Sequence, residues 1–188
     1  MMTAAELTTN RTFPLPSDVR MADKAAFRQA MAYVPAAVHI ITTDGPAGRA
    51  GVTVTAMCSL TDEPPMLIVC LNRQLRAAAA VIANGRLAIN TLPGDGAELS
   101  AVFAGQKGLD MEERFNTGAE WGLFDSRTPY LVDALCNIDC RVDNVVEQGT
   151  HYVLFCAVRD VRINRPDPGL IYHNRQYSVN ATGVDALA

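Results

Sequence analysis

Residues 51–71, GVTVTAMCSLTDEPPMLIVCL, carry the strongest structural signal in this sequence. The stretch is rich in β-branched and aliphatic residues, and two consecutive prolines interrupt it, so it predicts two strands, GVTVTAMCSL (51–60) and MLIVCL (66–71). Side chains alternate along a strand. The first strand is therefore predicted to place Thr53, Thr55 and Met57 on one face and Val52, Val54 and Ala56 on the other.

Working outward, four more segments have the composition of strands. They are AVHIITT (37–43), RLAINTL (86–92), ALCNIDCRVDNVVE (134–147) and THYVLFCAVRDVRI (150–163). In the third, the alternation predicts one face made of Cys136, Ile138, Cys140 and Val142. Gln148-Gly149 fits a tight hairpin between the last two. The final strand is apolar on both faces in its middle, which indicates that both faces are covered.

Three helices are predicted around these strands. Residues 22–34 place Phe27, Ala30, Met31 and Val34 at amphipathic spacing, and Pro35 is predicted to end that helix. QLRAAAAVIANG (74–85) is Ala-rich and closes on a glycine that suits a C-terminal cap, and a short helix is expected over 97–103. Residues 105–125 show no sustained period and are predicted to be irregular.

The order of these elements predicts a mainly β fold with peripheral helices, closed into a small barrel so that no sheet edge is exposed. We expect one domain over residues 22–180, a flexible N-terminal arm over 1–21 and a C-terminal tail over 181–188. The apolar outer face of the last long strand indicates a partner subunit, with a twofold homodimer as the default.

Composition excludes several functional classes. The 188 residues carry a net charge of -4 without a basic cluster, so nucleic acid is not an expected partner. No apolar run approaches the roughly 20 residues of a membrane span, and the first residues lack the pattern of a secretory signal. Five cysteines, an odd number, favour reduced thiols and a cytoplasmic location.

Motifs for other chemistries are absent. The three histidines show no metal-ligand spacing, and neither G-x-S-x-G nor G-x-G-x-x-G occurs. Cys136 and Cys140 lie about 13 Å apart along an extended strand, too far for a disulfide, and are interpreted as core residues. A zinc site, a serine hydrolase and a Rossmann dinucleotide site are therefore not expected.

Polar side chains gather at strand ends instead. Hydroxyls of Thr53, Thr55 and Ser59 could meet a ligand, although the same pattern is typical of a solvent-facing threonine stripe. Asn72, Arg73 and Arg76 follow a buried strand at the start of a helix, where phosphates bind well, although a solvated helix start has the same composition. Lys107 is a similar cationic candidate.

Two further groups stand near the C-terminus. His151 begins a strand directly after a glycine turn, a place from which side chains often face a site at a barrel rim, although a plain surface histidine is equally compatible with this position. The segment LIYHNRQY (170–177) collects Tyr172, His173, Arg175 and Tyr177. This aromatic and cationic set suits a flat, electron-rich ring, or else a terminal strand anchored by its tyrosines.

Eight segments in order resemble the short-chain flavin reductase family, which includes the reductase components of two-component flavin monooxygenases. They are FRQAMAYVPAAVHIITT, GVTVTAMCSLTDEPPMLIVCLN, LAINTL, VFAG, RF with Trp121, LCNIDCRV, GTHYVLFCAV and LIYHNRQYSV, within residues 22–179. The resemblance implies a Greek-key split β-barrel of the FMN-binding type, assembled as a homodimer with flavin near the subunit interface.

The resemblance also implies roles for individual residues. Thr53, Val54 and Thr55 would meet the isoalloxazine edge, and Cys58, Ser59 and Leu60 the ribityl chain. Asn72, Arg76 and Lys107 are the candidates for the phosphate, and His151, His173 and Tyr177 would lie near the nicotinamide, with His151 as the catalytic candidate. Many relatives carry Asp where this chain has Thr150.

The predicted function is therefore reduction of FMN, or FAD, by NADH or NADPH, followed by release of reduced flavin to a partner monooxygenase. Hydride transfer needs two rings held roughly 3 to 3.5 Å apart, so the protein would act mostly by placement. Two alternatives stay open: a flavin- or haem-binding carrier without turnover, and a flavin-bound reductase of another acceptor such as a corrinoid or ferric chelate.

Overall fold

The computed structural model describes residues 19–180, which fall into two units that divide after Met31. In the first unit, helix α1 (Lys24–Ala32) begins after Asp23, whose carboxylate accepts the N–H groups of Ala25 and Ala26. The helix predicted over 22–34 is present and is two residues shorter at each end. Most of the predicted arm and the whole predicted tail lie outside the described residues, so those two boundaries stay predictions.

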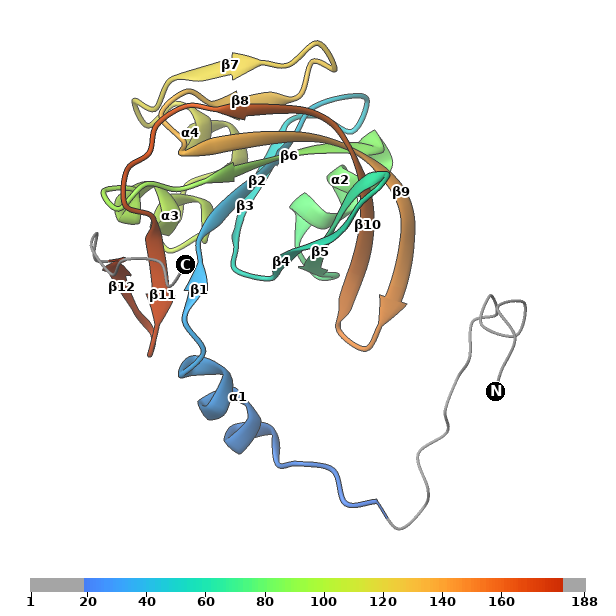
Figure 1. Cartoon of the computed structure of the whole chain (residues 1–188), viewed down its shortest axis with the longest axis vertical. Helices are drawn as coiled ribbons and strands as arrows, with labels where there is room; N and C mark the ends of the chain where they lie inside the picture. The colour runs from blue at the N-terminus through green and yellow to red at the C-terminus, as the bar shows by residue number, and fades with distance from the viewer. Residues whose placement is uncertain (1–18, 181–188) are drawn as a thin grey trace. The chain divides into compact units, whose positions relative to one another are not determined.

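The second unit is built on a seven-stranded antiparallel sheet with the strand order β3-β2-β6-β9-β10-β5-β4 (Figure 1). Its strands are β2 (His39–Thr43), β3 (Ala50–Val54), β4 (Met57–Asp62), β5 (Pro65–Asn72), β6 (Arg86–Thr91), β9 (Cys136–Gln148) and β10 (His151–Ile163). Two small sheets accompany it: β1 (Ala36–Ala37), β11 (Leu170–His173) and β12 (Gln176–Val179) form one, and β7 (Trp121–Leu123) and β8 (Pro129–Leu131) the other. The mainly β fold is confirmed.

The large sheet has to close on itself. Strands β3 and β4 form its two edges, yet only Thr55 and Ala56 separate them in the chain. Six strand spacings of about 4.8 Å would hold flat edges about 29 Å apart, whereas three peptide units reach about 11 Å at most. The short connection therefore draws the two edges near each other, and the sheet curls around helix α2 (Arg76–Asn84), as Figure 1 shows. Strands β3 and β4 do not pair with each other, so the expectation that no sheet edge is exposed is wrong.

Two predicted strands are wrong in their extent. The stretch 51–60 is not one strand: it bends at Thr55–Ala56, where the chain passes from one sheet edge to the other, so Thr53 and Met57 belong to different strands. The stretch 37–43 is divided at Val38, whose N–H donates to the Leu170 carbonyl. The first break lets one segment form both edges of the same sheet, and the second lets one segment contribute a strand to each of two sheets.

Apolar side chains form two clusters, one on each face of the curled sheet. The inner cluster joins residues such as Ile41, Val69 and Leu154 to the alanines of α2, whose small side chains let the helix fit against the inside of the barrel. That helix ends at Gly85 in the left-handed conformation, as predicted. The outer cluster, around Ile40, lies beneath helix α3 (Ala97–Phe103) and helix α4 (Met111–Phe115).

The prediction of an irregular segment over 105–125 is wrong in two places, since this stretch contains α4 and β7. Helix α4 begins with a capping box in which Asp110 accepts the Glu113 N–H and the Glu113 carboxylate accepts the Asp110 N–H. The D-x-x-E spacing is a recognised signal for a helix start. A five-residue helix is too short to show the periodicity on which the prediction depended.

The last two long strands differ from the prediction in detail. Gln148 pairs with His151, so the hairpin turn is Gly149–Thr150 rather than Gln148–Gly149. On β9 the face opposite the predicted apolar one is also buried, because Asn137 and Asp139 are 0% and 2% exposed. The start of β9 is therefore buried on both faces, and the second buried face carries polar side chains.

A network of buried asparagines explains this polar side. The Asn90 amide nitrogen donates to the carbonyl of Ile40 (2.8 Å) and to the Thr42 hydroxyl (3.1 Å). Its oxygen accepts the N–H of Leu131 (2.8 Å) and the amide of Asn137 (2.9 Å). These bonds attach the β7–β8 hairpin to the barrel.

No helix in the described part of the chain is long and apolar enough to cross a membrane.

Candidate functional site

The free edge of β3 carries the first group of predicted site residues. This strand pairs only with β2, and the Gly51 N–H points away from the sheet, toward the Met111 sulfur at 3.2 Å. N–H groups two residues apart on such a strand point the same way, so the Thr53 N–H also faces this free edge. The Thr53 hydroxyl donates to the carbonyl of Ser100 at 2.7 Å, and Thr55 is exposed at the bend.

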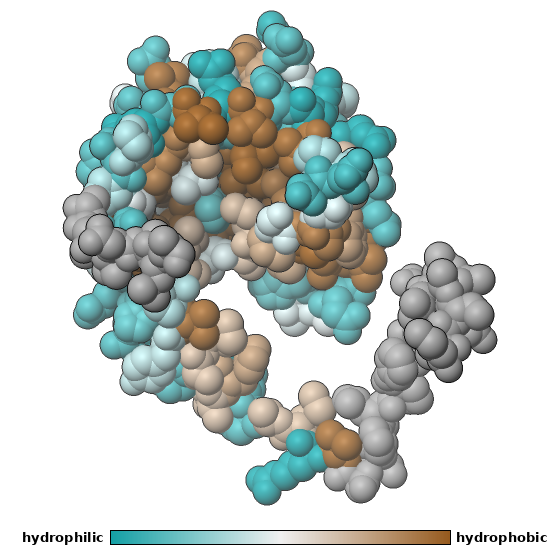
Figure 2. Space-filling view, viewed as in Figure 1, coloured by the Kyte–Doolittle hydropathy of each residue, from teal (hydrophilic) through white to brown (hydrophobic). Residues whose placement is uncertain are grey.

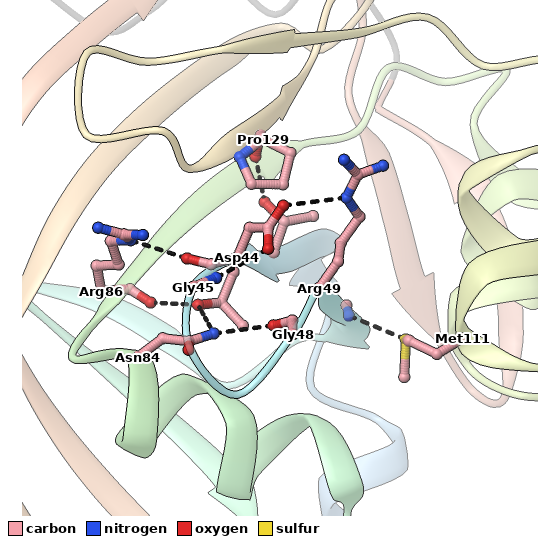
Figure 3. A network of polar contacts seen from close by, with 11 residues as sticks. Asp44, Gly45, Gly48, Arg49, Asn84, Arg86, Met111 and Pro129 are labelled. Atoms are coloured by element: carbon pink, nitrogen blue, oxygen red, sulfur yellow. Dashed lines mark hydrogen bonds and ion pairs between the residues drawn. The ribbon is translucent and has the colours of Figure 1, made fainter.

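A polar network holds the start of this strand in place (Figure 3). The Asn84 amide, at the end of α2, donates to the Thr43 hydroxyl (3.1 Å) and the Gly48 carbonyl (3.0 Å). The Arg86 guanidinium donates to the carbonyl of Asp44 at 2.8 Å. The β2–β3 connection is thereby fastened to α2, which gives the free edge of β3 a defined position.

Strand β4 continues the site beyond the bend. Cys58, Ser59 and Leu60 are all exposed, so the predicted ribityl-side residues are accessible. The Cys70 N–H donates to the carbonyl of Ala56 at 2.9 Å, which sets the bend against the end of β5. Burial, and secondarily the neighbouring Cys58 thiol, raise the pKa of Cys70. All five cysteines are free thiols.

The end of β5 brings together two residues that the sequence separates widely. Asn72 and His151 are direct cross-strand neighbours on β5 and β10. The Thr150 hydroxyl is 2.9 Å from Nδ1 of His151, which leaves Nε2 for another partner. Asn72 itself accepts the Gln74 N–H at 3.0 Å, and α2 begins four residues later at the exposed Arg76 without a side-chain cap. The helix start is thus available to an anion.

The C-terminal aromatic cluster lies on a hairpin rather than on a single strand. β11 and β12 pair with each other, and the rings of Tyr172 and Tyr177 are 5.4 Å apart. The Tyr177 hydroxyl is hydrogen-bonded to the hydroxyl of Ser100 at 2.8 Å. His173 is exposed near the tip, with its ring 6.4 Å from that of Tyr33 in an edge-on contact.

Lys107 does not take part in the contacts that join Thr53, Ser100 and Tyr177. It forms an ion pair with Glu98 at 2.7 Å, beside a cleft of about 480 Å³ that Leu99 and Val102 also line. Glu98 and Ser100 are two residues apart on α3, hence about 200° around the helix. The Lys107 side of α3 is therefore opposite to the side that holds Thr53 and Tyr177.

Sequence reasoning missed two buried polar residues beside these groups. Ser100 is 0% exposed and contacts both Thr53 and Tyr177. The sequence feature that could have identified it is a hydroxyl residue on the buried face of a helix. His39, a neighbour of Val54 in the sheet, has its Nδ1 3.1 Å from the Thr91 hydroxyl, and burial lowers its pKa to about 4. His39 is therefore neutral at pH 7.

Figure 2 shows apolar side chains gathered on the visible face of the barrel unit. Among the described residues, no cluster of His, Cys, Asp and Glu has the geometry to hold a metal ion. The donors that remain are backbone N–H groups, hydroxyls, an amide, a guanidinium and an imidazole.

Comparison with known proteins agrees with this arrangement. FMN reductase (NADH) RutF of Agrobacterium fabrum is 48% identical to this chain over 153 residues, which are 81% of this chain and 86% of that protein. The flavin reductase PheA2 has a TM-score of 0.77 at 26% identity, covering 86% of this chain and all of the other. A nitrilotriacetate monooxygenase component B homolog from Mycobacterium thermoresistibile has a TM-score of 0.79 at 25% identity, covering 88% and 92%.

The family model described as "Flavin reductase like domain" matches residues 31–181, which is most of the chain and nearly the whole of the barrel unit. This chain therefore belongs to the flavin reductase like domain family.

Proposed function

We propose that this chain is an NADH-dependent flavin reductase that reduces FMN and releases it to a flavin-dependent monooxygenase. The observation that carries this proposal is the 48% identity, over most of both chains, with a protein named FMN reductase (NADH). The likeness to component B of a monooxygenase supports the partner. FAD is a second candidate acceptor.

The residues of the barrel fit a flavin. An isoalloxazine ring presents carbonyl oxygens and ring nitrogens at one edge, and the free edge of β3 presents N–H donors at Thr53 and beyond. Exposed hydroxyl and thiol groups follow on Ser59 and Cys58, where a ribityl chain needs polar neighbours. Arg76 and the uncapped start of α2 supply donors for a phosphate.

When bound, FMN supplies the hydride acceptor and NADH the hydride. The N–H groups of the β3 edge would orient the ring and favour the negative charge that it gains. His151, beside Asn72 at the end of β5, has Nε2 directed away from its bond to Thr150, so it can orient the nicotinamide amide. No residue has to act as a nucleophile, because placement of the two rings accounts for the reaction.

The proposal predicts that the purified protein oxidises NADH when FMN is present in excess. Absorbance at about 340 nm, where reduced nicotinamide absorbs, should fall in proportion to the amount of protein. A carrier without turnover would bind flavin and leave this absorbance unchanged. A reductase of another acceptor would keep its flavin through desalting, whereas a reductase that releases flavin should lose it.

Replacement of His151 tests its role. His151→Ala should lower kcat/KM for NADH by about tenfold, because one hydrogen bond to the cosubstrate is worth about 1.4 kcal/mol, and it should leave the Kd for FMN unchanged. Gln148→Ala, on the opposite position of the same hairpin, is the matched control. Equal kinetics in His151→Ala and the parent protein would refute the role.

We also propose that the protein is a homodimer that uses the outer face of β5 and β10. Ile68, Val153 and Phe155 alternate with the buried residues of these strands and are only half-buried, and Val146 of β9 is 38% exposed. Such an apolar sheet face is normally covered. Light scattering should give twice the chain mass, and Phe155→Glu should give a folded monomer; a monomeric parent protein would refute the dimer.

A further inference from the structure

One residue of α3 connects the strand edge on the flavin side with the hairpin on the nicotinamide side. The main-chain carbonyl of Ser100 accepts the Thr53 hydroxyl at 2.7 Å, and its side-chain hydroxyl is bonded to the Tyr177 hydroxyl at 2.8 Å. Thr53 and Tyr177 are 124 positions apart in the chain, and each has an independent predicted role in the site.

Ser100 makes both bonds from a buried position. Ser100 is 0% exposed, so water does not compete for either group. Its carbonyl also accepts the Ala104 N–H at 2.8 Å, so that both lone pairs of the oxygen are used. This arrangement satisfies the carbonyl and the hydroxyl of Ser100 and both of their partners at once.

Helix α3 itself has little room to move against β3. Phe103, which is 0% exposed, packs its ring edge-on against Phe115 at 5.1 Å. A Cβ added to Gly51 would lie 2.6 Å from the same ring, so the helix rests directly on the strand backbone. The position of α3, and with it that of Ser100, is therefore fixed relative to β3.

We propose that Ser100 is a positioning residue for hydride transfer, which fixes the separation between the Thr53 edge and Tyr177. This inference rests on the proposed function. Hydride transfer depends steeply on ring separation, because the reacting atoms must approach to about 3 to 3.5 Å. Loss of the Ser100–Tyr177 bond should loosen the hairpin relative to β3 and slow the chemical step, while both ligands still bind.

Two single variants remove the same bond from its two sides. Ser100→Ala and Tyr177→Phe should each lower kcat by about tenfold and leave KM for NADH within about twofold. The Kd for FMN, measured by quenching of flavin fluorescence, should stay within about twofold. The double variant should be no slower than either single variant, because the bond can be removed only once.

The deuterium isotope effect separates positioning from structural damage. With NADH deuterated at the transferred position, the isotope effect on kcat should rise in both variants, because a slower chemical step becomes rate-limiting. Partial unfolding would lower kcat by reducing the active fraction and leave the isotope effect unchanged. Tyr177→Phe removes a single oxygen from a half-buried ring, so it keeps the test open if Ser100→Ala does not fold.

Matched controls are available elsewhere on the barrel. Ser126→Ala removes a buried serine hydroxyl that donates to Asp139, and Tyr130→Phe removes a hydroxyl from a ring that stacks on Arg162. Both should keep the parent kcat and isotope effect. Unchanged kcat and isotope effect in Ser100→Ala and Tyr177→Phe, or rate losses that multiply in the double variant, would overturn the positioning role. Failure of the parent protein to oxidise NADH would instead refute the proposed function.

Discussion

The buried amide of Asn90 provides a direct test of how the β7–β8 hairpin is held on the barrel. Asn90→Leu keeps the number of side-chain heavy atoms but removes both donors and both accepting lone pairs. The buried N–H of Leu131, which donates to the Asn90 oxygen, and the carbonyl of Ile40, which accepts from the Asn90 nitrogen, would lose these partners. At about 1–3 kcal/mol for each group, the expected loss is about 2–6 kcal/mol.

Asn137→Leu should cost less, about 1–3 kcal/mol, because the Leu131 N–H keeps its bond to Asn90 and the Leu131 carbonyl keeps the Ala134 N–H. The other lost partner is the amide of Asn164, which is exposed. Asn116→Leu, at an exposed helix end, should change stability by no more than about 0.5 kcal/mol. Urea unfolding at pH 7, with midpoint and slope both fitted, measures all three. The reasoning is refuted if Asn90→Leu loses less than about 1 kcal/mol, or if Asn137→Leu is the more damaging.

Three further predictions concern other features of the fold. Burial lowers the pKa of His39 to about 4, so between about pH 6.5 and 4 the unfolded state binds a proton at this residue and the folded state does not. The free energy of unfolding should therefore fall as the pH drops through this range. His39→Gln should remove this pH dependence, and His173→Gln, at an exposed histidine, should keep it. Arg127 is exposed and has a φ of 67°, so Arg127→Gly should raise stability by about 1 kcal/mol; a lower melting temperature would contradict this. Gly51→Ala should cost about 1–3 kcal/mol through the clash with Phe103, and an unchanged urea midpoint would argue against that contact.

Local signals in the sequence were sufficient for several parts of the site. The apolar run before Asn72, the alanine-rich helix that ends at Gly85 and the glycine turn before His151 are all features of neighbouring residues. They determine the element types, and the structure has those elements with small shifts of their ends. The resemblance of eight short segments to flavin reductases added the family, which the family model over residues 31–181 confirms.

Contacts between residues far apart in the chain could not be predicted from the local sequence. Nothing near Thr53 in the sequence indicates that its hydroxyl reaches Ser100, and nothing near Ser100 indicates Tyr177. Lys107 has the charge for a phosphate, but the helical turn between Glu98 and Ser100 places it on the other side of α3. A charge or hydroxyl can be recognised in a sequence, whereas the partner that it meets depends on the packing of whole elements.

The sequence by itself determined the β-rich composition and the succession of strands along the chain, because propensity and alternation act over a few positions. Its resemblance to flavin reductases supplied the candidate residues for a flavin, which stay predictions. Only the tertiary structure decided that the stretch 51–60 bends into two strands at opposite sheet edges, and that Asn137 and Asp139 are buried. The physical reason is closure of the barrel. Joining the edges through Thr55 and Ala56 fixes which faces turn inward, and this constraint involves all seven strands at once.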